Sequence, residues 1–408
     1  MNKIGRSVFL YGWFIVLVSL LLLCLMWSVY LIPIEKIRAN VSKSVDQVPT
    51  LLFADIHSYR IHKDNFTDSL MLNETSFWGR EPLYDALLNP RVEPRGRLNQ
   101  LGNLKSSVIT SGLENIPIID YGRYWHGYLL FLKPLTVFCD LQTIRIINLF
   151  VHVILLLSVL ILLYRRLDFR YSFAYFCAFL FLNPEITWQC LQYATSVNMM
   201  LLASLWILLA RNPSDRYIFF IVGAITSVFD FLTFPLVTLG FPLIIYICLY
   251  DRSFKNNVAC VIKNSLLWGL GYVGMFLGKW ILATVLTHQN VLLDGWENFL
   301  YRVGETEERA AFGQAVQRNI LEIYHVETLY FFVIFLFGLI FSYFIKPYRF
   351  LLSAKSLIVL GIGLMPFVWY AFLTNHSAVH HFMTYRILAI TICALFTSVV
   401  CCIKPKSV

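Results

Sequence analysis

Charged residues are scarce in this chain of 408 residues, since Asp, Glu, Lys and Arg together make up only 14% of it. A soluble domain carries roughly 25% charged residues. Hydrophobic residues make up 58% of the chain, and its mean hydropathy is +0.66. An ionised side chain is costly in hydrocarbon, so a chain that lies mostly within lipid must be poor in charge. The shortage of charge excludes an ordinary soluble domain and favours an integral membrane protein.

Several motifs are also missing. The nine cysteines form no Cys-x-x-Cys pair and lie mostly in apolar stretches, where we expect small buried hydrophobes rather than metal ligands or disulfides. The chain has no Gly-x-x-x-x-Gly-Lys-Ser/Thr and no Gly-x-Gly-x-x-Gly after a strand, which makes an ATP-driven pump or a cytoplasmic nucleotide-sugar enzyme improbable. No internal repeat is visible, so the inverted-repeat signature of many secondary transporters is not found.

Apolar runs recur along the chain, and a membrane span needs roughly 20 such residues. The N-terminal run is too long for a signal peptide and is interpreted as an uncleaved spanning helix. Together the runs predict a single all-α, polytopic membrane domain over 1–408 with about ten transmembrane helices. The predicted spans are 10–32, 142–164, 171–187, 193–210, 217–233, 236–250, 264–287, 327–345, 351–373 and 383–403.

The formal net charge of +9 agrees with this interpretation. Lys and Arg lie mainly at the ends of the apolar runs and in alternate connections, which is an orientation signal rather than a nucleic-acid-binding surface. We therefore expect no nucleic-acid partner. The positive-inside rule places both termini in the cytoplasm of a multi-pass protein in the bacterial inner or plasma membrane.

Two long connections fall on the opposite, outer side. The first covers 33–141, and its end, Tyr121 to Phe138, is aromatic and apolar, which is typical of a helix lying in the membrane interface. The second covers 288–326 and ends in an amphipathic stretch that we expect to rest on the outer membrane face. A connection as long as the first is usually functional.

Polar residues within the spans are the first candidates for a site. Asp230 lies near the outer end of a span, where it either reaches headgroup water or points into a cavity. Lys279 follows glycines at 271, 274 and 278, which should let another helix approach closely. Its ammonium group either snorkels to the surface or binds an anion at the outer rim of the bilayer.

The last outer turn holds the densest polar cluster. Arg offers a rigid donor fork, and His and Asn add donors near a helix N-terminus, so this turn favours phosphate binding over a plain polar loop. Zinc is disfavoured because no nearby acid or Cys completes a tetrahedral set. The candidates are Asn375, His376, His380, Tyr385 and Arg386.

The first outer loop supplies carboxylates and a second aromatic cluster. Its acids are Asp46, Asp55, Asp64, Asp68, Glu74, Glu81, Asp85 and Asp120. The run Arg123-Tyr124-Trp125-His126 combines aromatic rings with donors, a composition suited to a sugar or a phosphate. Arg145 lies near the outer end of the second span and is expected to face the same cavity.

One spanning helix, a long acidic outer loop and then a bundle resemble the GT-C superfamily of membrane glycosyltransferases, in its uncharacterised bacterial members. The resemblance covers most of the chain as architecture. The matching pieces are Phe66 to Leu72, Tyr124 to Tyr128, Phe229 to Pro235, Gly278-Lys279-Trp280, Asn375 to Ser377 and Tyr385-Arg386. They are moderately specific and say little about the substrate.

The resemblance implies an inverting transfer of a sugar from a polyprenyl-phosphate carrier to a glycan or lipid acceptor on the outer membrane face. An acid of the first loop would act as general base, with Asp68 as first choice and Asp55 next, although GT-C enzymes usually carry this acid nearer the first span. No cofactor is demanded, although a divalent cation is possible. Three alternatives remain: a transporter or flippase of lipid-linked glycans, a glycan polymerase or ligase, and an assembly protein without catalysis.

Overall fold

Helices dominate the structure, a computed structural model that describes residues 3–48, 64–109, 116–210, 217–250, 252–305, 309–323, 326–345 and 348–405. Within these ranges β-structure is limited to two antiparallel two-stranded sheets. One pairs β1 (Arg91–Val92) with β2 (Ile118–Ile119), and the other pairs β3 (Tyr348–Phe350) with β4 (Ile403–Pro405). The prediction of an all-α chain is confirmed.

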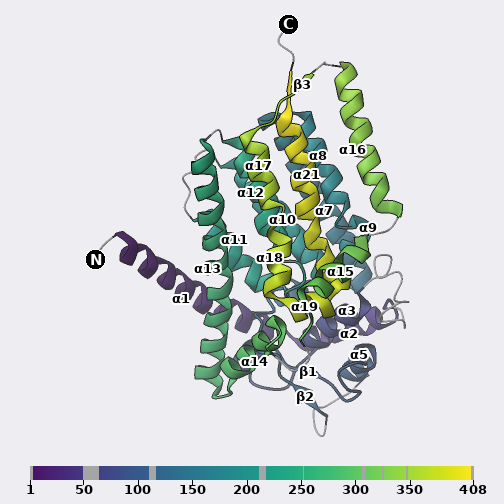
Figure 1. Ribbon diagram of the computed structural model, residues 1–408. Helices are drawn as coiled ribbons and strands as arrows, with labels where there is room; N and C mark the ends of the chain where they lie inside the picture. Colours follow the sequence, from purple (N-terminus) through teal and green to yellow (C-terminus); the bar gives the residue numbers. More distant parts are fainter. Residues whose placement is uncertain are drawn as a thin grey trace.

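The helices follow one another along the chain in a long bundle with a smaller helical region at one end (Figure 1). In chain order they are α1 (Lys3–Tyr30), α2 (Ile34–Val45), α3 (Asn65–Thr75), α4 (Pro82–Leu88), α5 (Gln100–Ile109), α6 (Leu129–Thr136), α7 (Leu141–Arg166), α8 (Phe169–Leu180), α9 (Pro184–Thr187), α10 (Leu191–Leu209), α11 (Ile218–Phe229), α12 (Val237–Leu249), α13 (Phe254–Thr287), α14 (Val291–Val303), α15 (Phe312–Ile323), α16 (Val326–Ile345), α17 (Ala354–Ile362), α18 (Met365–Phe372), α19 (Thr374–Val379), α20 (His381–Thr384), the 3-10 helix η1 (Tyr385–Leu388) and α21 (Ala389–Cys402).

Among the described residues, six segments are long and apolar enough to cross a membrane, which makes the chain a multi-pass membrane protein. They are α1, α7, α10, α13, the α17–α18 pair and the stretch from α20 to α21. Helices α8, α11 and α12 have 12, 12 and 13 residues. At about 1.5 Å per residue each is shorter than the ~30 Å hydrocarbon layer. Length and composition therefore give six candidate spans in the part of the chain that the structure describes, and the count of about ten stays a prediction.

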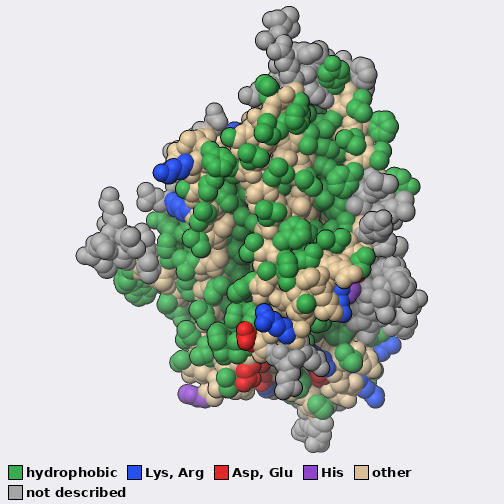
Figure 2. All heavy atoms as spheres, in the orientation of Figure 1, with side chains coloured by type: hydrophobic (Ala, Val, Ile, Leu, Met, Phe, Trp, Pro, Cys, Tyr) green, Lys and Arg blue, Asp and Glu red, His purple; other side chains and the backbone are tan. Residues whose placement is uncertain are grey.

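Burial separates the centre of the bundle from its edge. The apolar stretch of His381–Cys402 is 83% buried and that of Leu191–Leu209 is 67% buried, whereas only 17% is buried in Phe9–Tyr30 and Leu141–Arg166. Helices α10 and α21 thus form the centre, while α1 and α7 expose apolar side chains to the surroundings. Hydrophobic side chains also cover most of the upper part of the face in Figure 2, and charged side chains gather mainly toward its lower end.

Glycines bring α11 and α13 into direct backbone contact. A Cβ atom added at Gly271 would lie 2.1 Å from the carbonyl oxygen of Phe220, and one at Gly223 would lie 2.0 Å from that of Trp268. Such distances are far inside van der Waals contact, so only glycine fits at either position. Gly274 and Gly278 similarly face Ile15 and Ser19 of α1. The predicted close approach of other helices to this stretch is confirmed.

The described parts of the segment between α1 and α7 form five short helices and the β1–β2 sheet, and they lie at one end of the bundle beside α14 (Figure 1). Its predicted interfacial helix is shorter than expected, because α6 begins only at Leu129. The indole of Trp125 donates to the carbonyl oxygen of Met275 at 2.7 Å and ties this region to α13. Lys279 of α13 donates to Ala86 O at 3.1 Å and to Asn89 Oδ1 at 3.0 Å.

Lys279 is fully buried, so it neither snorkels to the surface nor faces an open anion site. Its ammonium group lies at the C-terminal end of α4, where helix carbonyls carry partial negative charge. The ammonium group of Lys133 likewise lies at the C-terminal end of α3, where its Nζ donates to Thr75 O at 2.9 Å. Two buried lysines thus hold helix ends of the loop region in place.

Candidate functional site

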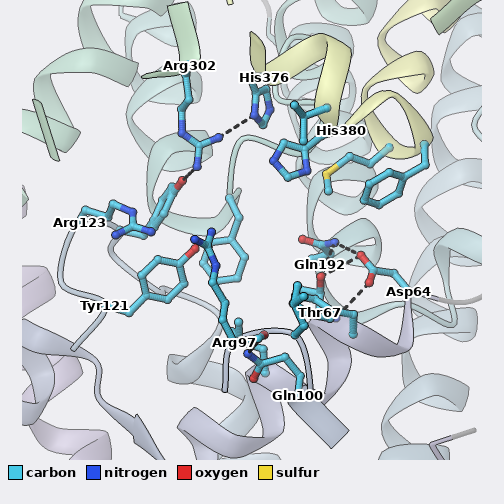
Figure 3. A pocket seen from close by; sticks show the side chains of 18 of the residues that line it. Asp64, Thr67, Arg97, Gln100, Tyr121, Arg123, Gln192, Arg302, His376 and His380 are labelled. Atoms are coloured by element: carbon cyan, nitrogen blue, oxygen red, sulfur yellow. Dashed lines mark hydrogen bonds between the residues drawn. The ribbon is translucent and has the colours of Figure 1, made fainter. Parts of the chain in front are cut away.

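A cavity of about 420 Å³ lies where the loop region meets the end of the bundle. Four arginines line it, so it is called the arginine cavity below (Figure 3). Its lining residues are Asp64, Phe66, Thr67, Leu70, Arg91, Arg97, Leu98, Gln100, Tyr121, Arg123, Tyr124, Gln192, Phe231, Arg302, His376, Val379, His380, Phe382 and Met383. They come from α3, β1, α5, α10, α14, α19, α20 and the connections between them.

Asp64 is the one carboxylate among the described residues of this lining, and local sequence fixes its position. It is the N-cap of α3, where its side chain accepts from Thr67 N and Thr67 Oγ1 at 3.0 and 2.9 Å. Asp is favoured at such positions because its carboxylate satisfies a free N–H of the first turn. Gln192 of α10 donates to the same carboxylate. Burial raises the pKa of Asp64 although these donors oppose the shift, so the carboxylate is a stronger base than an exposed one.

The four arginines differ in how their charge is balanced. Arg91 pairs with Glu93 at 2.7 Å, and Arg123 pairs with Asp294 at 3.2 Å. Within the described residues Arg302 has neutral partners alone, because it donates to Tyr124 Oη and to His376 Nδ1, both at 2.6 Å. Arg97 is exposed, and its side chain has no hydrogen bond or ion pair to any part of the chain that the structure describes. The cavity therefore carries an excess of positive charge.

His376 links Arg302 to a strained turn. Since a guanidinium only donates, Nδ1 of His376 must accept, and Nε2 must carry the proton that it donates to Leu232 O at 2.6 Å. Burial and the charge of Arg302 lower the pKa of His376 well below its usual value, so the ring is neutral. Leu232 has a φ of +64°, a left-handed conformation that is unusual for a leucine.

Asp230 shapes that turn rather than lining the cavity. Its carboxylate accepts from Thr233 N at 2.9 Å and from Ser196 Oγ at 3.3 Å. This Asx-type turn directs Phe231 into the cavity wall. Of the two sequence-based expectations for Asp230, an exposed helix-end acid and a cavity-facing acid, the structure supports neither.

Figure 3 shows how the polar groups are distributed. Asp64, Thr67 and Gln192 form one side of the cavity, while Tyr121 and Arg123 lie on the other. Arg302 and the two histidines stand above, and Arg97 reaches in from below. The apolar members of the lining include Leu70 and Phe382. A base on one wall and several cations facing it suit a substrate with a phosphate group and a reacting hydroxyl.

Four predicted site residues line the arginine cavity: Arg123, Tyr124, His376 and His380. Asp55, the second choice for the base, lies outside the described residues. The remaining nine candidates lie elsewhere, and their contacts show what each does. They are Asp68, Trp125, His126, Arg145, Asp230, Lys279, Asn375, Tyr385 and Arg386.

Asp68, the first choice for the base, is fully buried behind the wall and does not reach the cavity. Its carboxylate pairs with Arg145 at 2.8 Å and accepts from Leu191 N at 2.9 Å. Arg145 also donates to Gln189 O at 2.7 Å. Asp68 and Arg145 therefore attach α3 to α7 and to the start of α10.

His126 does not line the cavity and belongs to a second buried polar group. Its Nδ1 is 2.9 Å from Glu74 Oε2, and its Nε2 donates to Tyr121 O at 2.9 Å. Tyr128 donates to the same Glu74 carboxylate. This group supports Tyr121, which lines the cavity, so His126 acts on the site only through its neighbour.

Much of the dense polar cluster between Asn375 and Arg386 is structural. Asn375 accepts from Ala310 N at 2.7 Å and donates to Tyr301 O at 3.0 Å, which fixes the connection after α14. Tyr385 donates to Asn183 Oδ1 at 2.9 Å. Arg386 is buried and donates to Leu182 O and Phe382 O at 3.2 and 3.1 Å. Phosphate binding by these three residues is not supported.

Sequence reasoning missed several lining residues, including Arg91, Arg97, Gln192 and Arg302. Asp64 was among the candidate acids but was not chosen. The spacing Asp64-x-x-Thr67 is a helix N-cap pattern and would have placed this acid at a helix end instead of within the helix. Among the described residues there is no group of three or more His, Cys, Asp or Glu that could hold a metal ion.

Comparison of the chain with protein-family models finds no match, and neither do comparisons with curated proteins and with solved structures.

Proposed function

We propose that this protein is an inverting glycosyltransferase that moves a sugar from a polyprenyl-phosphate carrier to a glycan or lipid acceptor. The observation that carries the proposal is that Asp64, the one carboxylate of the described lining, faces an excess of guanidinium groups across the arginine cavity. The GT-C resemblance of the sequence points the same way. Asp64 replaces Asp68 as the proposed base, because Asp68 is buried in an ion pair outside the cavity.

In the proposed reaction, Asp64 accepts the proton of an acceptor hydroxyl while that oxygen forms a bond to the anomeric carbon. The bond from this carbon to the carrier phosphate oxygen breaks, and the electron pair leaves with the phosphate. Fixed donors lower the barrier where the negative charge develops. Arg302 and Arg97 are suited to that role, since no described carboxylate competes for their charge.

The proposed topology keeps about ten membrane passages, with both termini cytoplasmic and the arginine cavity at the outer face. The polyprenyl chain would then lie in the bilayer while its phosphate lies at headgroup depth. The topology is tested by a fluorescent protein fused to the C-terminus, which fluoresces only in the cytoplasm, and by protease access to the segment around Arg97 from outside. A dark fusion, or cleavage from the cytoplasmic side only, contradicts this orientation.

The activity is tested with purified protein in lipid and a panel of polyprenyl-phosphate sugars. Asp64→Asn should lower turnover by about 10²- to 10⁴-fold, the usual contribution of a general base. Asp46→Asn is the matched control, because Asp46 is exposed and lies in the same loop, away from the cavity. Equal activity of Asp64→Asn and Asp46→Asn would refute the assignment of the base.

The cation role is tested with a second matched pair. Arg97 and Arg95 are both exposed and lie two residues apart, but only Arg97 lines the cavity. Arg97→Gln should reduce transfer, whereas Arg95→Gln should not. If no carrier supports transfer or donor hydrolysis, the glycosyltransferase proposal fails, and movement of lipid-linked glycan across vesicles becomes the activity to measure.

A further inference from the structure

A second cavity, of about 330 Å³, is lined by residues at the starts of α13 and α17 and by Ile403 of β4. The sheet of β3 and β4 lies at the end of the bundle opposite to the loop region (Figure 1). The cavity is called the α13–α17 cavity, because the first residues of these two helices line it: Phe254 of α13 and Ala354 of α17. Arg252, Asn257 and Lys355 line it as well. Its lining shares no residue with the arginine cavity.

Both helix ends are positive at this cavity. The first N–H groups of a helix have no partner inside the helix, and the helix dipole adds partial positive charge there. Ser253 and Ser353 are the N-caps, and each satisfies one N–H of its first turn. Phe254 and Ala354, the first residues of the two helices, both line the cavity, so their N–H groups lie where an anion is favoured.

Side chains add formal charge to these backbone groups. Arg252 donates to Tyr246 Oη at 3.0 Å and to Cys260 Sγ at 3.2 Å, and neither partner is an acid. Lys355 contributes a second cation to the lining. No carboxylate belongs to the part of the lining that the structure describes, so this described lining is positively charged.

Asn257 supplies an independent sign of a missing partner. Its side chain is only 2% exposed and lines the cavity from the first turn of α13. Nδ2 donates weakly to Arg252 O at 3.4 Å, whereas Oδ1 has no hydrogen-bond partner among the described residues. A buried carbonyl oxygen normally has a donor. A ligand that carries a hydroxyl next to its anionic group would supply one.

We infer that the α13–α17 cavity binds a phosphate group that carries a neighbouring hydroxyl. The phosphate accepts from Arg252, Lys355 and the first N–H groups of the two helices, while the hydroxyl donates to Asn257. The same chemistry occurs in the headgroup of an anionic glycerophospholipid and in free phosphate esters. Exposed apolar side chains at Phe254, Leu351 and Leu352 favour the lipid, because acyl chains need such neighbours. The site is independent of the proposed glycosyl transfer.

The test is native mass spectrometry of the full-length protein released from bilayers of phosphatidylglycerol and phosphatidylcholine. Wild type should retain phosphatidylglycerol preferentially. Asn257→Asp replaces the amide nitrogen by an oxygen and so places a negative charge in the cavity with almost no change in shape. It should lower the retention of phosphatidylglycerol about tenfold, which is the effect of losing roughly one charged contact. Lys255→Gln is the control, since Lys255 is exposed on the same turn and does not line the cavity.

The source of the phosphate is resolved by competition with excess glycerol phosphate. Displacement of the lipid assigns the site to the phosphate ester itself, and resistance assigns it to the lipid headgroup with its chains; either result supports the inference. A double variant, Arg252→Gln with Lys355→Gln, is measured as well, because the carboxylate introduced by Asn257→Asp can pair with these cations and hide part of the loss. Equal retention in wild type, Asn257→Asp and the double variant would overturn the inference, provided that all elute as folded protein in gel filtration.

Discussion

The buried pair of Asp68 and Arg145 offers the sharpest test of the structural assignments. Both side chains are almost fully buried, and they join α3 of the loop region to α7 of the bundle at 2.8 Å. In Asp68→Asn the amide oxygen can still accept from Leu191 N, but the guanidinium of Arg145 loses its counter-charge. We expect Asp68→Asn to act on stability rather than directly on chemistry.

The magnitude follows from the burial of the pair. Removing one partner of a buried ion pair leaves an uncompensated charge and costs about 3–5 kcal/mol. Arg145→Met should cost a similar amount, since it leaves Asp68 buried and also removes the donor to Gln189 O. The double variant removes both charges, so its loss should be smaller than the sum of the two single losses by about 1–3 kcal/mol.

The assay is reversible unfolding of the purified protein in mixed detergent micelles, followed by tryptophan fluorescence, for the wild type and the three variants. Asp46→Asn serves as a control of equal charge change at an exposed site. A coupling energy near zero would refute the argument, as would an Asp68→Asn variant that is as stable as the wild type but inactive. The second result would return Asp68 to the position of catalytic base.

Three further predictions concern packing, pH and helix capping. Gly271→Ala should destabilise the protein by about 1–3 kcal/mol because its Cβ would meet a backbone oxygen at 2.1 Å, whereas Gly269→Ala, with nothing within 4 Å, should be neutral or stabilising in the same unfolding assay. The lowered pKa of His376 means that the unfolded chain binds a proton below pH about 6.5 that the folded chain does not. Wild type should therefore lose up to ~2 kcal/mol more stability between pH 7 and pH 5 than His376→Asn, and equal losses would contradict a neutral buried ring. Lys279→Met should cost about 1–3 kcal/mol and speed proteolysis of the loop region, because two acceptors at the end of α4 lose their donor; an unchanged cleavage rate would argue against its capping role.

The membrane character and the glycine contacts could be predicted from the sequence because both depend on local composition. An apolar run can be recognised from the sequence without knowing which helices it packs against, and the glycines preceding Lys279 repeat at helical spacing. The number of spans is harder to predict. Helices α11 and α12 are apolar but have only 12 and 13 residues, and apolar composition alone does not separate a short buried helix from a full membrane crossing.

The site was harder to predict, because type and spacing do not tell which way a polar side chain points. Asp64 and Asp68 lie one helical turn apart, yet one caps α3 and lines the arginine cavity while the other is buried against Arg145. Arg302 is more than two hundred residues from Asp64, and nothing local connects them. The cluster at 375–386 was favoured as a site because it is dense in polar residues, but most of these polar groups donate to carbonyl oxygens inside the fold.

The surroundings of the buried cations explain why the arginine cavity, rather than the sites around Lys133 and Lys279, is the candidate for binding the substrate's anionic group. Lys133 and Lys279 are buried, but each is satisfied by carbonyl groups at the end of a helix, so neither needs a ligand. Arg97 and Arg302 instead face an open volume, and no described carboxylate balances them. Like charges kept around a cavity repel one another and weaken the fold unless an anion is bound there part of the time. In the proposed reaction a bound carrier phosphate would relieve that repulsion, and the same guanidinium groups would stabilise this phosphate as it leaves with the electron pair.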